Sequence, residues 1–151
     1  MSASALPDWA TGLGLQPHPE GGWFAETWRS TLTIPNSVLP EVYSGNRSAG
    51  TAIYFLLLAG EQSGWHTVRS AEIWLYHRGS PVALDLGGDG DVPGDPTTIL
   101  VGPDLSAGHQ PQVVVPPGRW QRARPAADEP ALVSCIVVPG FDFEAVSYTH
   151  L

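Results

Sequence analysis

GEQSGWHTVRSAEIWLYHRG, at residues 60–79, is the stretch that decides the fold class. Two short runs within it, residues 65–69 and 71–77, are bounded by glycine-containing turns, which is typical of successive β-strands. Alternate side chains of a strand share a face, so His66 points to one side of the first run and Glu72 to one side of the second. If both sides face the interior of a barrel, the imidazole and the carboxylate converge there.

The rest of the chain repeats this pattern of short strands and turns. Glycine and proline are abundant, at 17 and 15 residues, which favours many short strands over long helices. Further strands are expected at residues 23–29, 51–58, 82–86, 97–101, 112–115, 120–124 and 132–138. A short N-terminal helix is expected at residues 7–13, where PDWATGL precedes the first strand. We predict an all-β protein, with one sandwich or barrel domain over residues 1–151.

Charge and composition exclude several classes of partner. The net charge is -8, and the seven basic residues are all arginine without forming a basic stripe, so we expect neither nucleic acid nor an anionic membrane as a partner. Cys135 is the single cysteine, which excludes an internal disulfide and favours a buried, inert thiol. The N-terminus has no signal-peptide pattern, and the apolar run 52–60 is too short to span a bilayer. We therefore expect a cytoplasmic protein.

His66 and Glu72 are the first candidates for chemistry. A buried glutamate needs a partner, a metal ion or a raised pKa. Histidine and carboxylate side chains are good ligands for a divalent metal, and they serve equally well as a general acid–base pair. The tight PPG turn at residues 116–118 leads into the strand that carries Gln121, whose amide can donate or accept hydrogen bonds inside the barrel.

The spacing of these residues resembles the first motif of the cupin superfamily, G-x5-H-x-H-x3-4-E-x6-G. Gly60, His66, Glu72 and Gly79 occupy its fixed positions, and Val68 replaces its second histidine. The second cupin motif is represented by Pro116-x-Gly118, with Gln121 in place of its histidine. The resemblance implies a metal centre with four protein ligands. His66 and Glu72 are retained here, whereas Val68 and Gln121 replace the other two, so any divalent metal would be held weakly.

Longer segments are similar to the cupin-5 family, a jelly-roll group related in fold to sugar-nucleotide epimerases of the RmlC type. They are PHPEGGWFAETWRS, RSAGTAIYFLL, the stretch around His66, QVVVPPGRWQ and V-x-P-G-F-D-F, and together they extend over about residues 15–146. The family implies a homodimer with a pocket in each barrel. It implies no established reaction, and a metal is not a settled part of it.

Several other side chains are candidates for contacting a small-molecule substrate. Tyr54, Trp74 and Tyr76 are expected to line the pocket, as apolar lining or with one tyrosine as an acid. Arg29 and Arg69 suit an anionic substrate, although salt bridges with the surplus carboxylates explain them equally well.

Glu20 lies with His18 in the PHPEGG loop. This loop either caps the barrel mouth or is a turn held by its own hydrogen bonds.

Three functions fit this sequence. The first is an enzyme of the isomerase or epimerase type, in which His66 acts as base or acid with Glu72 as its partner, and Gln121 with an arginine orients a sugar-like or carbonyl-bearing substrate. The second is a metal-assisted enzyme with His66 and Glu72 as partial ligands. The third is a non-catalytic barrel that binds a small ligand.

Overall fold

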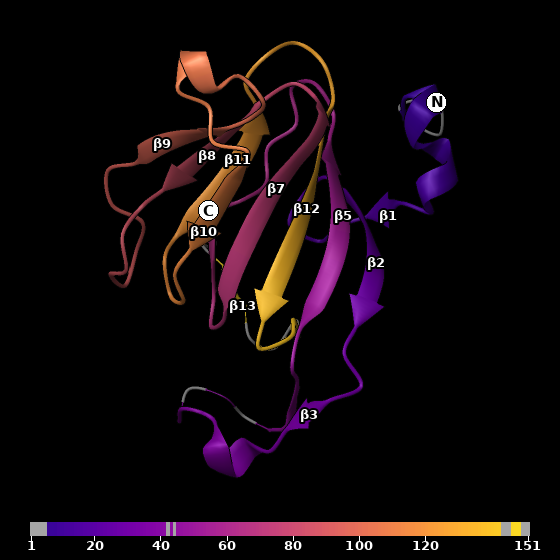
Figure 1. Cartoon of the computed structure of the whole chain (residues 1–151). Coiled ribbons are helices and arrows are strands. Elements are labelled where there is room, and N and C mark those ends of the chain that lie inside the picture. Colours follow the sequence, from indigo (N-terminus) through magenta and orange to yellow (C-terminus); the bar gives the residue numbers. More distant parts are fainter. Residues whose placement is uncertain (1–5, 42, 44, 143–145, 149–151) are drawn as a thin grey trace.

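Two antiparallel sheets form the body of the protein in this computed structural model, which describes residues 6–41, 43, 45–142 and 146–148. The larger sheet has six strands in the order β1-β2-β5-β12-β7-β10. Their bounds are β1 (Gln16–Pro17), β2 (Trp23–Arg29), β5 (Thr51–Leu57), β12 (Ala131–Val138), β7 (Ala71–Gly79) and β10 (Gln112–Val115). The two sheets face each other as in a jelly roll (Figure 1).

The smaller sheet has five strands in the order β13-β6-β11-β8-β9. Their bounds are β13 (Val146–Tyr148), β6 (His66–Val68), β11 (Gln121–Pro125), β8 (Val82–Leu86) and β9 (Thr97–Val101). The first predicted strand pair is therefore divided between the sheets, because β6 belongs to the smaller sheet and β7 to the larger one. His66 and Glu72 thus approach the interior from opposite layers.

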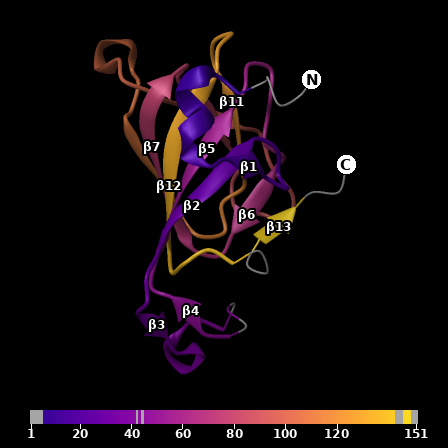
Figure 2. The same ribbon diagram turned by 90° about the vertical axis from the view of Figure 1, so that its right-hand side faces the viewer.

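A small arm extends away from this body, as both views show (Figures 1 and 2). It contains β3 (Thr33–Ile34), the 3₁₀ helix η3 (Asn36–Val38) and β4 (Arg47–Ser48), and β3 pairs with β4. A third 3₁₀ turn, η4 (Leu105–Ala107), follows β9. The predicted N-terminal helix is the 3₁₀ helix η2 (Asp8–Leu13), which the left-handed Gly14 ends.

The central strands are covered on both faces, as their apolar runs predict. Phe55 and Leu57 of β5 belong to the main core between the sheets. Leu56, on the opposite face of β5, packs in a second cluster with Ala10 of η2 and Leu132 of β12. Figure 2 shows η2 lying over this outer face of the larger sheet. Burial on both sides explains why this strand lacks the usual alternation of apolar and polar residues.

The predicted strands are confirmed, with small differences at their ends. The strand predicted at 120–124 begins at Gln121, and the one predicted at 65–69 is limited to His66–Val68. In the part of the chain that the structure describes, no helix is long and apolar enough to cross a membrane. Phe143, the last residue of the segment V-x-P-G-F-D-F, lies outside the described residues.

Candidate functional site

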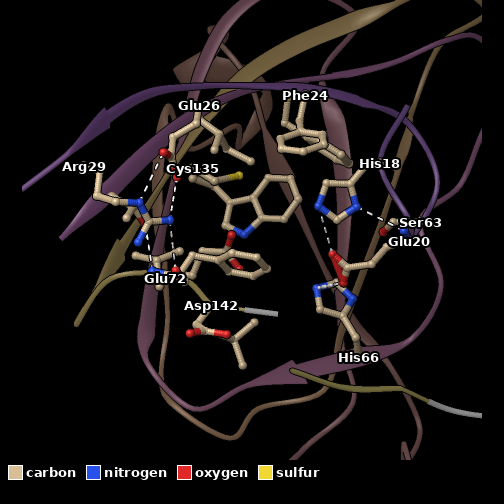
Figure 3. A pocket seen from close by; sticks show the side chains of 17 residues that line it. His18, Glu20, Phe24, Glu26, Arg29, Ser63, His66, Glu72, Cys135 and Asp142 are labelled. Carbon is tan, nitrogen blue, oxygen red and sulfur yellow. Dashed lines mark hydrogen bonds and ion pairs between the residues drawn. The ribbon is translucent and has the colours of Figure 1, made fainter. Parts of the chain in front are cut away.

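A cavity of about 370 Å³ opens between the two sheets (Figure 3). It is lined by side chains of β2, β5, β6, β7 and β12, by Ser63 of the loop before β6, and by two further segments that lie far apart in the sequence. One segment supplies His18 and Glu20, and the other supplies Phe141 and Asp142. The cavity is within the size range of ordinary small-molecule sites.

The loop that carries Glu20 is folded sharply against the barrel. The backbone N–H of His18 donates to the carbonyl of Gly22 over 2.8 Å, and that of Gly21 donates to the carbonyl of His18 over 3.0 Å. Gly22 has φ +83°, and a Cβ atom there would come within 2.9 Å of the Phe55 ring. Only glycine combines this conformation with so close an approach. This tight turn therefore directs the side chain of Glu20 into the cavity.

Glu20 lies between two histidines in the cavity. Oε2 of Glu20 is 3.0 Å from Nε2 of His66, and Oε1 is 3.4 Å from Nε2 of His18. All three side chains are at least nine-tenths buried. Oε2 is fully buried, and its nearest charged or titratable neighbour among the described residues is Nε2 of His66.

Backbone contacts determine where the two imidazoles carry their protons. Nδ1 of His66 is 2.9 Å from the carbonyl of Gly64, which can only accept, so Nδ1 holds the proton of the neutral ring and Nε2 holds a lone pair. Nδ1 of His18 accepts from the backbone N–H of Glu20 over 3.0 Å, so Nε2 holds the proton of His18. Glu20 thus has a donor on one side and an acceptor on the other.

Burial favours the neutral form of every member of this group. It raises the pKa of Glu20 to about 8, and the nearby negative charge of Glu72 adds to the effect. Burial also lowers the pKa of His66 to about 4, against the hydrogen bond to Gly64. The pKa of His18 falls to about 4 through burial and repulsion from His66. At neutral pH a carboxylic acid therefore lies beside an unprotonated imidazole nitrogen.

Glu72 reaches the same cavity from β7. Gln121 donates from Nε2 to Oε1 of Glu72 over 2.8 Å, while Oε1 of Gln121 accepts from Nε1 of Trp74 over 3.0 Å. Burial raises the pKa of Glu72 to about 7, although hydrogen bonds from Gln121 and Cys135 oppose the shift. Trp74 thus fixes the orientation of the amide, and the amide fixes the carboxyl group of Glu72.

A sequence model of the family Cupin_5, described as Cupin superfamily (DUF985), matches residues 7–149. The chain belongs to this cupin family. It is 34% identical over 149 residues to the uncharacterized protein YML079W of Saccharomyces cerevisiae, an alignment that covers 92% of this chain and 70% of the yeast protein.

Solved structures agree with this assignment. Protein SO0799 of Shewanella oneidensis is 32% identical, with a TM-score of 0.80 over 94% of this chain and 82% of that one. A cupin-2 domain of Rhodospirillum rubrum is 15% identical, with a TM-score of 0.56 over 93% of this chain and 77% of that one. This more distant likeness shows the fold alone, and it confirms the predicted cupin jelly roll.

The donors at the four cupin ligand positions do not fit a four-ligand metal centre. Val68 offers no donor atom, and the amide of Gln121 is already engaged with Trp74 and Glu72. Among the described residues, no group of three His, Cys, Asp or Glu side chains is arranged to hold a metal ion. The groups in this pocket that can exchange protons are its carboxyl and imidazole side chains.

Three of the other predicted substrate contacts either line the pocket or act on it through a lining residue. Trp74 and Arg29 line the pocket together with Glu20, His66 and Glu72. Gln121 is 1% exposed and acts on the pocket through Glu72.

The remaining three candidates lie elsewhere in the cupin fold. Tyr54 packs in the outer cluster, with its ring edge against His77. Tyr76 donates its hydroxyl to the carbonyl of Gly79, at the end of β7. Arg69 is half-buried next to the arm, where its carbonyl accepts from Tyr43.

Sequence reasoning gave too little weight to His18, Ser63 and Cys135, which all line the pocket. His18 and Ser63 come from irregular segments, to which strand alternation does not apply. Cys135 is buried as predicted, but its contact with Glu72 places it in the pocket wall. The sequence did contain a signal for the position of Cys135. It alternates with Val133 and Val137 along β12, and all three side chains point inward.

Proposed function

We propose that this cupin is an enzyme of the isomerase or epimerase type, which moves a proton on a small carbonyl-bearing or sugar-like substrate. The observation that carries the proposal is the presence of two buried carboxyl groups, Glu20 and Glu72, that face one cavity with pKa values of about 8 and 7. Acid–base catalysis is most effective when the pKa of the catalytic group lies near the working pH.

The two carboxyl groups have different protonation states at neutral pH. Glu72 is partly ionised and serves as the base, because its pKa is about 7. Glu20 retains its proton and serves as the acid, because its pKa is about 8. Nε2 of His66, 3.0 Å from Oε2 of Glu20, accepts a hydrogen bond from the substrate or from the acid.

A complete proton shift needs only these groups. The carboxylate of Glu72 removes the proton on the carbon next to the carbonyl, the C–H electron pair forms the C=C bond of an enediol, and Glu20 protonates the carbonyl oxygen. Glu72 then returns its proton to the former carbonyl carbon. The neighbouring hydroxyl gives its proton to the carboxylate of Glu20 as the new carbonyl forms. Both side chains end in their starting state, so no oxidant or further reactant is consumed.

Solvent deuterium exchange tests this proposal across many candidate substrates at once. Purified protein is incubated in D₂O with a panel of aldoses, ketoses, sugar acids and sugar phosphates, and ¹H NMR follows loss of the proton next to the carbonyl. We expect exchange in at least one compound with the wild type and none above background with Glu72→Gln. Glu129→Gln, which changes an exposed loop carboxylate, is the matched control and should retain exchange.

Two results would contradict the proposal. The first is exchange that persists in Glu72→Gln and Glu20→Gln at the wild-type rate. The second is a compound that binds the wild type tightly by calorimetry while neither exchange nor conversion is seen, which would indicate a ligand-binding barrel without catalysis.

A further inference from the structure

Arg29 faces the pocket because β2 contains an extra residue. Simple alternation along β2 would place Arg29 on the face opposite Glu26. The pairing with β5 is regular up to Glu26, opposite Ile53, and resumes with Trp28 opposite Ala52, so Thr27 has no partner. This bulge brings Arg29 onto the same side as Glu26, and both line the cavity. Bulges of this kind often redirect a side chain next to a functional site.

The guanidinium of Arg29 is held in place while part of it is left open. Nη2 donates to Oε1 of Glu26 over 2.7 Å and to the carbonyl of Phe141 over 3.2 Å, and Nε donates to Oε2 of Glu26 over 3.2 Å. Within the described part of the chain, Nη1 makes no hydrogen bond. A planar cation fixed on one edge and open on another is prepared to bind an oxyanion.

A second arginine lies next to the same rim. Nη1 of Arg47 is 2.6 Å from Oδ2 of Asp142, which lines the cavity one residue after Phe141. The side chain of Arg47 is 4% exposed, and its Nε and Nη2 have no hydrogen-bond partner among the described residues. The segment 141–142 therefore connects two arginines at one side of the cavity. The buried charge of Arg47 offsets that of Asp142, which would otherwise repel an anion.

The acid–base group lies on the other side of the cavity. Figure 3 shows Arg29 and Glu26 across the pocket from His18, Glu20 and His66. Burial favours the uncharged forms of Glu20 and His66 at neutral pH, since it raises the pKa of the first and lowers that of the second. The side of the cavity formed by Glu20 and His66 therefore presents little negative charge to an entering ligand. Glu72, with a pKa of about 7, is the partly charged carboxyl group of the inner wall, and Arg29 on the opposite side offers an anchor for an anion.

We propose that the substrate carries an anionic group, a carboxylate or a phosphate, which Arg29 binds while the carbonyl end reaches Glu20 and Glu72. Glu26 is a positioning residue that holds the guanidinium in the required orientation. This assignment rests on the proposed function for the role of the carbonyl end, whereas anion binding at Arg29 stands without it.

Three matched sugars test the anchor by isothermal titration calorimetry. Glucose is neutral, glucuronate carries a carboxylate, and glucose 6-phosphate carries a phosphate. We expect one or both anions to bind the wild type about 10- to 100-fold more tightly than glucose, the range of a charge-assisted hydrogen bond. The anion that is preferred identifies the group. The preference should disappear in Arg29→Gln and weaken at high salt.

Glu26→Gln separates an anchor from an ordinary surface ion pair. The amide oxygen still accepts one hydrogen bond from Arg29, but the second acceptor is lost, so the guanidinium is held less firmly and the preference for the anion should weaken without disappearing as it does in Arg29→Gln. A merely structural ion pair predicts equal losses of melting temperature in Glu26→Gln and Arg29→Gln, with no change in relative affinity for the three sugars.

The same titrations in Glu72→Gln keep the two proposals apart. If the anion preference survives in this variant while deuterium exchange is absent even in the wild type, the anchor is correct and the proposed reaction is wrong. Equal affinity for all three sugars in the wild type, or an anion preference that Arg29→Gln leaves unchanged, would overturn the anchor.

Discussion

Asp85 and the pair Glu20 and Glu72 are all buried carboxyl groups, yet their surroundings differ. Burial alone would raise the pKa of Asp85, but hydrogen bonds from Thr98, Arg122 and Arg124 outweigh it and hold the pKa below its ordinary value. The side chain of Asp85 is 2% exposed, and both arginines contact its Oδ2 at 2.8 Å. Glu20 and Glu72 are surrounded by imidazole, amide and thiol groups, and their pKa values rise to about 8 and 7.

These surroundings divide the buried carboxyl groups into those that stabilise the fold and those that can transfer a proton. A carboxylate paired with two arginines is fixed in its charged form, so it contributes to stability and cannot exchange a proton near neutral pH. A buried carboxyl group without such a partner weakens the fold when it ionises, and it is suited to proton transfer. The first kind lies on β8 of the smaller sheet, and the second kind faces the cavity.

The largest expected effect is on catalysis at Glu72. Glu72→Gln should lower the rate of deuterium exchange by about 10²- to 10⁴-fold, the usual contribution of a general acid or base. Its melting temperature should stay the same or rise, because the variant no longer buries an ionisable group. Asp85→Asn should show the reverse, with lower stability and a near-normal rate. A large loss of stability in Glu72→Gln would show that the two kinds of carboxyl group are not distinct.

The next effect is on folding at Asp85. Asp85→Ala should destabilise the protein by about 2–3 kcal/mol, because charge-assisted hydrogen bonds to two partly exposed arginines are lost. Urea denaturation gives the free energy of unfolding, and ligand binding by the remaining folded protein should be unchanged. Thr98→Val, which removes a neutral donor to the same carboxylate, should cost less.

The pH dependence of stability should be dominated by Glu20 and Glu72 above pH 6.5. Their folded pKa values exceed the ordinary value of 4.5, so the folded state retains protons that the unfolded chain has lost, and stability falls as pH rises through about 8. The lowered pKa values of His18 and His66 act in the opposite direction, but only between about pH 4 and 6.5.

The variant Glu20→Gln isolates the contribution of Glu20 to the pH dependence of stability. Between pH 6.5 and 8.5 the wild type should lose on the order of 1–2 kcal/mol more stability than the variant. Thermal melts at intervals of half a pH unit measure the slope, and Glu129→Gln serves as the control. Identical slopes in Glu20→Gln and the wild type would mean that Glu20 is already ionised in the folded protein at neutral pH.

The smallest effect is expected at Gln121, which contacts the site only through Glu72. Gln121→Leu removes a hydrogen bond that lowers the pKa of Glu72, so the pKa should rise further and the acidic limb of the exchange rate should move to higher pH. The raised pKa of Glu72 would then differ even more from the lowered pKa of Asp85. A lower rate with an unmoved pH profile would indicate a packing role beside Trp74 alone.

Much of the fold could be predicted from sequence because strand boundaries depend on local signals. Glycine and proline in the turns, together with the apolar runs between them, place β2, β8, β9 and β10 at their observed bounds. His66 and Glu72 were found from motif spacing, which reflects how β6 and β7 enter the two sheets. Tyr54 illustrates the limit, because it alternates with Ile53 and Phe55, and only the sheet packing decides which of them faces the cavity.

The acid–base group was harder to predict, because it depends on contacts between distant segments. The partner of His66 is Glu20, from a loop that precedes the first long strand, and not Glu72 from the next strand in the sequence. The inward direction of Arg29 depends on the unpaired Thr27, and its parity in the sequence points the other way. Buried pairing, bulges and loop closure are properties of the assembled barrel.

The cavity takes wall residues from near both ends of the sequence, with Glu20 from the first loop and Asp142 after the last strand of the larger sheet. A chain still under synthesis cannot form the whole wall until residue 142 has been made. Ligand binding therefore requires the chain as far as Asp142, and it adds its free energy to the unfolding of the whole barrel. A ligand that contacts both segments would reversibly link two parts of the chain that lie more than a hundred residues apart in the sequence.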